Sequence, residues 1–155
     1  MQIHINIGSN LGDREALLHT AVERVLDTFP GTAVCSRMIE TPAWGFESEH
    51  PFLNVGVSIT IRSAADPLTI LYTLQSIERE ISSAPHRDGT GGYIDRPLDI
   101  DLIAIDGMVF DTPELTLPHP RMHEREFVLV PLAETAPEWR HPLLHLTATQ
   151  LLARL

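Results

Sequence analysis

Two aspartates interrupt an apolar run that otherwise predicts a buried β-strand. The run reads Leu98-Asp99-Ile100-Asp101-Leu102-Ile103. Because side chains alternate across a strand at about 3.3 Å per residue, Asp99 and Asp101 should share one face, roughly 6.6 Å apart, with apolar side chains on the other. Aspartate is depleted in strands, and two like charges on one face repel each other. The chain must therefore fold so that one face of this strand is apolar and the other acidic.

This acidic pair predicts a site for a divalent cation that prefers oxygen ligands. Arg96, directly before the pair, adds a cation suited to phosphate. The alternative is a solvated strand face with a chance pair of aspartates, and this segment alone favours neither.

Composition limits the possible classes of protein. A chain of 155 residues predicts one domain, 1–155, with a substantial core, and 43% hydrophobic with 21% charged residues is typical of globular proteins. No stretch approaches the roughly 20 apolar residues of a membrane span, and no basic leader precedes the first strand. The single Cys35 excludes an internal disulfide and predicts a small buried side chain in a reducing cytoplasm.

The net charge of −10 argues against nucleic-acid binding, which needs a basic face. An anionic ligand would therefore need a local cluster of cationic side chains and metal ions.

Apolar periodicity and turn residues predict the order of elements. Strands are expected at 2–7, 32–39, 52–61 and 98–105, and helices at 15–28, after an Asp13 cap, and from Asp66-Pro67 to about 81. Loops are expected at 8–13, 40–50 and 82–95. Asp106-Gly107 predicts a hairpin turn into 108–110, a proline-punctuated connection follows at 113–120, and shorter helices at 124–132 and 144–155. The order β-α-β-β-α-β predicts a ferredoxin-like α+β fold, an antiparallel sheet backed by helices.

Three further segments are weak signals when taken singly. The turn at 8–12 suits an anion, although a tight turn is the more favoured interpretation. Trp44, Phe52 and Asn54 suit the binding of a flat heteroaromatic ligand. The alternative is that Phe52 is an ordinary core residue and Trp44 anchors its loop. His119 and Arg125 suit phosphate, with a zinc site as the rival. For Arg121 and Glu126 simple surface charge is favoured.

Taken in order, the motifs are far more specific. The chain contains Gly-Ser-Asn-Leu-Gly at 8–12, Thr-Pro at 41–42 with Phe-Leu-Asn at 52–54, and Arg-x-x-Asp-x-Asp at 96–101. It then contains Leu-Pro-His-Pro at 117–120 with Arg-x-Phe-Val-Leu-x-Pro-Leu at 125–132. This ordered set resembles the 6-hydroxymethyl-7,8-dihydropterin pyrophosphokinases of folate biosynthesis. The resemblance extends from Ile3 to Leu132.

The resemblance implies transfer of a pyrophosphoryl group from ATP to the hydroxymethyl group of the pterin, which releases AMP. It implies that Asp99 and Asp101 hold two Mg²⁺ ions and act in catalysis with Arg96. The implied pterin-binding residues are Thr41, Pro42, Trp44, Phe52, Asn54, Tyr93 and Phe127. The implied nucleotide-binding residues are Glu78, Arg87, Arg96, Thr116, His119 and Arg125. It fits a monomer that binds small molecules and neither nucleic acid nor membrane.

One departure from the family pattern keeps alternatives open. Many members carry Gly-Arg-x-Arg soon after the glutamate matched by Glu78, whereas 82–87 here reads Ser-Ser-Ala-Pro-His-Arg, in which Arg87 is the one arginine. A homologue that binds pterin and nucleotide but turns over weakly is therefore one alternative. A metal-dependent hydrolase that uses Asp99, Asp101 and His119 is another.

Overall fold

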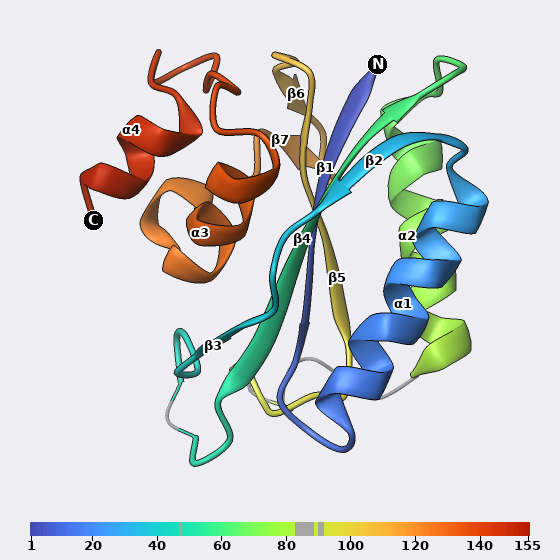
Figure 1. Ribbon diagram of the computed structural model, residues 1–155, viewed down its shortest axis with the longest axis vertical. Coiled ribbons are helices and arrows are strands. Elements are labelled where there is room, and N and C mark those ends of the chain that lie inside the picture. Colours follow the sequence, from blue (N-terminus) through green and yellow to red (C-terminus); the bar gives the residue numbers. More distant parts are fainter. Residues whose placement is uncertain (47, 83–88, 90–91) are drawn as a thin grey trace.

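An antiparallel sheet forms the centre of the molecule, with helices on both faces (Figure 1). The computed structural model describes residues 1–155 apart from 47, 83–88 and 90–91. Strands β1 (Gln2–Ser9), β2 (Gly31–Cys35), β4 (Phe52–Ile61) and β5 (Asp99–Ile105) lie in the order β2-β4-β1-β5, and the short β3 (Ile39–Thr41) pairs with β4. Together with the two crossing helices this order confirms the ferredoxin-like α+β prediction.

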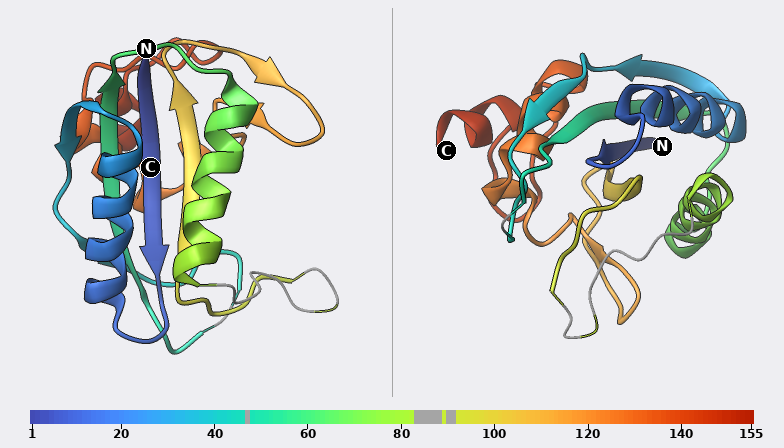
Figure 2. Two further views of the ribbon diagram at one scale, coloured as in Figure 1. Left: turned by 90° about the vertical axis from the view of Figure 1, so that its right-hand side faces the viewer. Right: turned by 90° about the horizontal axis from the view of Figure 1, so that it is seen from below.

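One face of the sheet is apolar and packs on α1 (Arg14–Thr28) and α2 (Pro67–Ile81), which lie side by side in Figure 2. The odd-numbered isoleucines of β1, at 3, 5 and 7, are at most 2% exposed in this core. Both helices begin as predicted. The Asp13 carboxylate accepts a hydrogen bond from the Ala16 amide at 3.1 Å, and Asp66 accepts one from the Thr69 amide at 3.3 Å.

The opposite face of the sheet is polar along β1, where it carries His4, Asn6 and Gly8. It is covered in part by α3 (Glu126–Thr135), which begins after the 3₁₀ turn η1 (Met122–Glu124) and packs on α4 (Ala148–Ala153). The backbone of β4 comes close to α3 at Gly56, where an added Cβ would lie 2.7 Å from Pro131 Cβ. Helix α3 thus covers part of this face. It leaves open the last residues of β1 and the first residues of β4 and β5.

Two predictions about the strands need correction. The expected strand 32–39 is divided into β2 and β3, and Cys35 is exposed rather than buried, because β2 is the edge strand of the sheet. The Asp106-Gly107 turn forms, with the Met108 amide 3.0 Å from the Ile105 carbonyl. However, β6 (Phe110–Asp111) pairs with β7 (Thr116–Leu117), inside the predicted proline connection, and not with β5.

The predicted helix ends are also shifted. Helix α3 runs beyond the expected end at 132 to Thr135 and includes Pro131. The expected helix 144–155 is reduced to α4, because Thr147 starts it with a capping box to Gln150. Among the described residues, no helix has both the length and the apolar composition needed to cross a membrane.

Candidate active site

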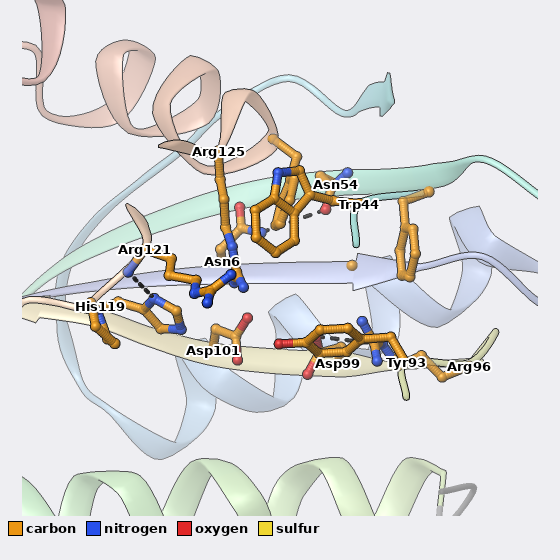
Figure 3. Close-up of a pocket in the computed structure, with 14 residues that line it drawn as sticks. Asn6, Trp44, Asn54, Tyr93, Arg96, Asp99, Asp101, His119, Arg121 and Arg125 are labelled. Carbon is orange, nitrogen blue, oxygen red and sulfur yellow. Dashed lines mark hydrogen bonds and ion pairs between the residues drawn. The ribbon is translucent and has the colours of Figure 1, made fainter. Parts of the chain in front are cut away.

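A cavity of about 360 Å³ opens on the polar face of the sheet, beside α3 (Figure 3). We call it the first cavity. It is lined by Asn6, Gly8, Trp44, Phe52, Asn54, Tyr93, Arg96, Asp99, Asp101, His119, Pro120, Arg121, Arg125 and Phe127.

Strand β5 supplies the acidic pair. Asp99 lies opposite Gly8 and Asp101 opposite Asn6 in the register of β5 with β1, and both carboxylates reach the first cavity as Figure 3 shows. Arg96 Nε lies 3.6 Å from Asp99 Oδ2.

The donor set fits a magnesium ion. Among the described residues no group of three or more His, Cys, Asp or Glu side chains could enclose a metal, so a cation here would have two carboxylates and otherwise water or ligand oxygens. Mg²⁺ is usually bound in this way, through one or two carboxylates together with substrate phosphates.

Two buried arginines each lie between aromatic rings. The guanidinium carbon of Arg125 lies 4.4 Å from the ring centre of Trp44 and 5.5 Å from that of Phe127. That of Arg96 lies 5.2 Å from the Phe52 ring and 5.6 Å from the Tyr93 ring. Ring faces attract cations, so these contacts compensate for the removal of both guanidinium groups from water. The cavity therefore has fixed positive charge suited to an anionic ligand.

His119 is a neutral hydrogen-bond donor in this site. Burial, together with the nearby Arg125, lowers its pKa to about 4, although Asp99 acts in the opposite direction. Its Nδ1 accepts a hydrogen bond from the Arg121 amide at 3.3 Å, which leaves the proton on Nε2. His119 can thus donate to an acceptor such as a phosphate oxygen without carrying a charge.

The Asn54 amide is oriented by its neighbours. Its Nδ2 donates to Thr41 Oγ1 at 3.0 Å, and its Oδ1 accepts from Asn6 Nδ2 at 3.5 Å. Thr41 is itself buried and lies outside the lining. One N–H and one lone pair of Asn54 remain for a ligand with a polar edge.

Asn10, at the loop after β1, joins three segments and holds Arg96 in place. The side-chain oxygen Oδ1 of Asn10 accepts a hydrogen bond from the Arg96 backbone amide at 2.7 Å. The backbone amide of Asn10 donates one to the Arg96 carbonyl at 3.1 Å. Its Nδ2 donates to Asp95 at 2.6 Å and to the His50 carbonyl at 3.1 Å. Ser48 Oγ also donates to Asp95, at 2.5 Å.

A second cavity, of about 550 Å³, lies between α2, β5 and the segment 113–120. Its lining includes Glu78 and Thr116, and it shares Asp99, Asp101 and His119 with the first cavity. Glu78 Oε2 accepts a hydrogen bond from the Ile100 amide at 2.9 Å. The acidic pair thus stands where the two cavities meet.

The structure brings most of the predicted site residues together. Trp44, Phe52, Asn54, Tyr93, Arg96, Arg125 and Phe127 line the first cavity, Glu78 and Thr116 the second, and Asp99, Asp101 and His119 both. Pro42 is exposed and lines neither, and Arg87 lies outside the described residues.

Sequence reasoning missed several residues of the site. Arg121 is exposed, as the surface-charge interpretation expects, but it also lines the first cavity and lies over the Trp44 ring at 5.6 Å. Its position two residues after His119 was a usable signal. Asn6 was also missed, and Asn10 was recognised only as part of the turn at 8–12. A polar residue in the middle of an apolar strand was the signal for Asn6.

The chain is an α+β protein with two cavities that meet at the acidic pair. The aromatic rings and the amide of the first cavity suit a flat aromatic ligand, and the cations beside the acidic pair suit an anionic one. Comparisons with known proteins identify the family. Residues 4–137 match the family 7,8-dihydro-6-hydroxymethylpterin-pyrophosphokinase (HPPK).

Two relatives named 2-amino-4-hydroxy-6-hydroxymethyldihydropteridine pyrophosphokinase are similar over most of their length. The one from Porphyromonas gingivalis is 45% identical over 142 residues, which cover 90% of this chain and 93% of the relative. The one from Methylorubrum extorquens is 38% identical over 137 residues, covering 87% and 82%. This chain belongs to the HPPK family.

A solved structure agrees with the fold. Plasmodium falciparum HPPK-DHPS matches with a TM-score of 0.70 at 14% identity, over 99% of this chain. The present chain spans 44% of that longer chain.

Proposed function

We propose that this chain transfers a pyrophosphoryl group from ATP to 6-hydroxymethyl-7,8-dihydropterin, with the pterin in the first cavity and the nucleotide in the second. The observation that carries this assignment is that both cavities share Asp99 and Asp101. A phosphate chain that extends from one cavity and a hydroxymethyl group that extends from the other would meet at these carboxylates.

The pterin would be recognised by the amide of Asn54 and by the surrounding rings. Phe52 and Phe127 would lie on either side of the pterin ring, with Trp44 and Tyr93 closing over it. Thr41 would act through its hydrogen bond to Asn54, and Pro42 through the shape of the loop that carries Trp44. A flat ring with a polar edge matches this mixture of aromatic and amide groups.

The nucleotide would be held by the second cavity and by cations at its border. Glu78 and Thr116 would contact the nucleoside, and His119 would donate its Nε2 proton to a phosphate oxygen. Arg96 and Arg125 would neutralise phosphate charge. Arg87 is proposed as a further nucleotide contact.

In the reaction, the pterin hydroxyl oxygen would attack the β-phosphorus in line. A bond from that oxygen to phosphorus would form, and the hydroxyl proton would pass to solvent. The bond from the β-phosphorus to the oxygen it shares with the α-phosphorus would break, and AMP would leave with that oxygen. We propose that Asp99 and Asp101 hold two magnesium ions, which supply charge neutralisation and lower the pKa of the attacking hydroxyl when bound. The chain's own part is positioning and electrostatics, which dominate phosphoryl transfer.

A single assay tests the function against its alternatives. ATP, MgCl₂ and the reduced pterin are expected to yield AMP and the pterin diphosphate in equal amounts. AMP that fails to form despite measurable binding of both ligands would mean a binding homologue. Phosphate released from ATP without pterin would mean a hydrolase that uses Asp99, Asp101 and His119.

We further propose that residues 1–155 act as one monomeric domain in the cytoplasm, without nucleic-acid or membrane partners. The family match over 4–137 and the apolar clusters on both faces of one sheet support a single unit. The net charge of −10 disfavours nucleic acid. Light scattering coupled to size exclusion, which should give one chain's mass of 17.3 kDa, tests the monomer.

A further inference from the structure

A row of buried polar side chains extends from the first cavity to a region beneath α3. His4 lies two residues before Asn6 on the same polar face of β1, and it lies opposite Ser58 of β4. His4 is 1% exposed and Ser58 2% exposed, and Thr135 of α3 meets them from above. Of this row, Asn6 alone lines the first cavity, between Asn54 and Asp101 in Figure 3.

The hydroxyl groups determine which nitrogen of His4 carries the proton. Thr135 Oγ1 donates to the Leu132 carbonyl at 3.4 Å, and Ser58 Oγ donates to Thr135 Oγ1 at 2.8 Å. A hydroxyl has a single proton, so Ser58 Oγ must accept at its contact with His4 Nδ1, 2.7 Å away. Burial lowers the pKa of His4 to about 4, despite an opposing effect of Asp106. The ring is therefore neutral at pH 7, and its Nε2 is an acceptor.

Two buried acceptors, on side chains that line one small space, then lack a donor. His4 Nε2 and Asn6 Oδ1 are both buried, and neither has a hydrogen-bond partner among the described residues. Both side chains line a space of about 10 Å³ between β1, β4, β5 and α3. A space of roughly 10 to 15 Å³ is the smallest that holds one water. A water molecule has two O–H groups, which is the number of donors needed here.

We propose that one water molecule bridges His4 Nε2 and Asn6 Oδ1, and that His4 and Asn6 thereby act as positioning residues for Asn54. With its oxygen held by the water, the Asn6 amide must turn its Nδ2 toward Asn54 Oδ1, as observed at 3.5 Å. Asn54 Nδ2 is then committed to Thr41. The role of Asn54 in pterin recognition rests on the proposed function, whereas the water and the tautomer do not.

The first test addresses the water and the tautomer without any substrate. A high-resolution crystal structure is expected to show an ordered water within about 3.2 Å of both His4 Nε2 and Asn6 Oδ1. Long-range ¹H–¹⁵N spectra at pH 7 should show a neutral His4 protonated on Nδ1. A dry space would overturn the proposed water. A ring protonated on Nε2 would overturn the proposed tautomer, because the water would then accept from Nε2 and not donate to it.

The second test measures positioning by direct binding. His4→Phe keeps a flat ring but removes the acceptor, and is expected to weaken binding of 6-hydroxymethyl-7,8-dihydropterin by about three- to tenfold, the effect of one neutral hydrogen bond. Binding of ATP should not change. His4→Gln, which retains an acceptor, should restore pterin binding to within about twofold of wild type.

Thr60→Val is the matched control, because it removes an exposed hydroxyl of β4 outside the buried row and leaves Ser58, Thr135 and the water in place. Its pterin affinity should equal that of wild type. Equal loss of affinity in Thr60→Val and His4→Phe, or no loss in either, would overturn the positioning role. If His4→Phe does not fold, His4→Leu, which also removes the acceptor, takes its place. A wild-type protein that binds no pterin would instead contradict the proposed function.

Discussion

The two buried arginines of the first cavity have neighbours that offset their burial. Arg96 and Arg125 are 8% and 7% exposed, aromatic rings lie beside both, and the Asp99 carboxylate lies beside Arg96. Unpaired buried charges are costly, so these contacts allow the charges to stay in position before any ligand binds. A preformed site of this kind spends less of its binding energy on ordering side chains.

At the residue scale, Asp101→Asn removes a charge and keeps the shape of the side chain. We expect kcat to fall by at least about a hundredfold, because several kcal/mol of charge stabilisation is lost with the metal. The release of AMP measures this, and circular dichroism checks the fold. Asp27→Asn, an exposed aspartate on α1, is the matched control and should be fully active. Retained turnover in Asp101→Asn would show that the metal is held elsewhere.

At the scale of elements, three loops meet at Asn10. Asn10→Ala removes side-chain bonds to Arg96, Asp95 and the His50 carbonyl. Because a shift of about 1 Å in a positioning element can cost a hundredfold in rate, we expect kcat to fall by about ten- to a hundredfold. Steady-state kinetics measure this.

Ser48→Ala is the graded comparison for Asn10→Ala, since it removes the bond to Asp95 and the bond from the His50 amide, and leaves the bonds to Arg96 intact. It should have a clearly smaller effect on kcat. Equal losses in the two variants would contradict the view that Asn10 acts through Arg96.

The contact between α3 and β4 gives a second prediction at this scale. In Gly56→Ala the new methyl group would lie 2.7 Å from Pro131 Cβ, so α3 must move. Overpacking of this kind costs about 1–3 kcal/mol of unfolding free energy, and the pterin KM should rise because Phe127 and Arg125 lie at the start of α3. Gly107→Ala, which has open space around it, should be neutral in both measurements. Urea unfolding that is unchanged in Gly56→Ala would contradict this packing.

Local signals explain which elements were predictable. Helices α1 and α2 begin at Asp13 and Asp66 because each cap bonds to the backbone three residues on, which the sequence shows directly. The division between β2 and β3 was not predictable, since it depends on how the chain after Cys35 pairs with β4. Pairing partners distant in sequence likewise decided that β6 joins β7.

The candidate site shows the same limit. Asp99 and Asp101 were found because charges are unusual in a strand, and His119 and Arg125 because they cluster in sequence. The role of Asn10 was missed because it depends on partners up to 86 positions away, such as Arg96.

At the scale of the whole molecule, the two histidines His4 and His119 make stability depend on pH. Both have a pKa of about 4 in the folded protein, against about 6.5 in an unfolded chain. The unfolded state therefore binds more protons between these values, and the free energy of unfolding should fall as the pH drops from about 6.5 to about 4. Urea unfolding at pH 7.5, 6 and 5 measures this. A His4→Phe variant should show a shallower fall, and an identical slope would contradict the contribution of His4.

The position of β2 at the margin of the sheet has a consequence for handling the protein. All residues of 31–35 are exposed, they carry no charge, and Val34 is 48% exposed. Edge strands without charges or proline are templates for pairing with another molecule. Concentrated solutions should therefore begin to associate along this margin, at a distance from both cavities. Val34→Lys should therefore reduce association in concentrated solutions, which makes the protein easier to store and crystallise, and should leave its catalytic activity unchanged.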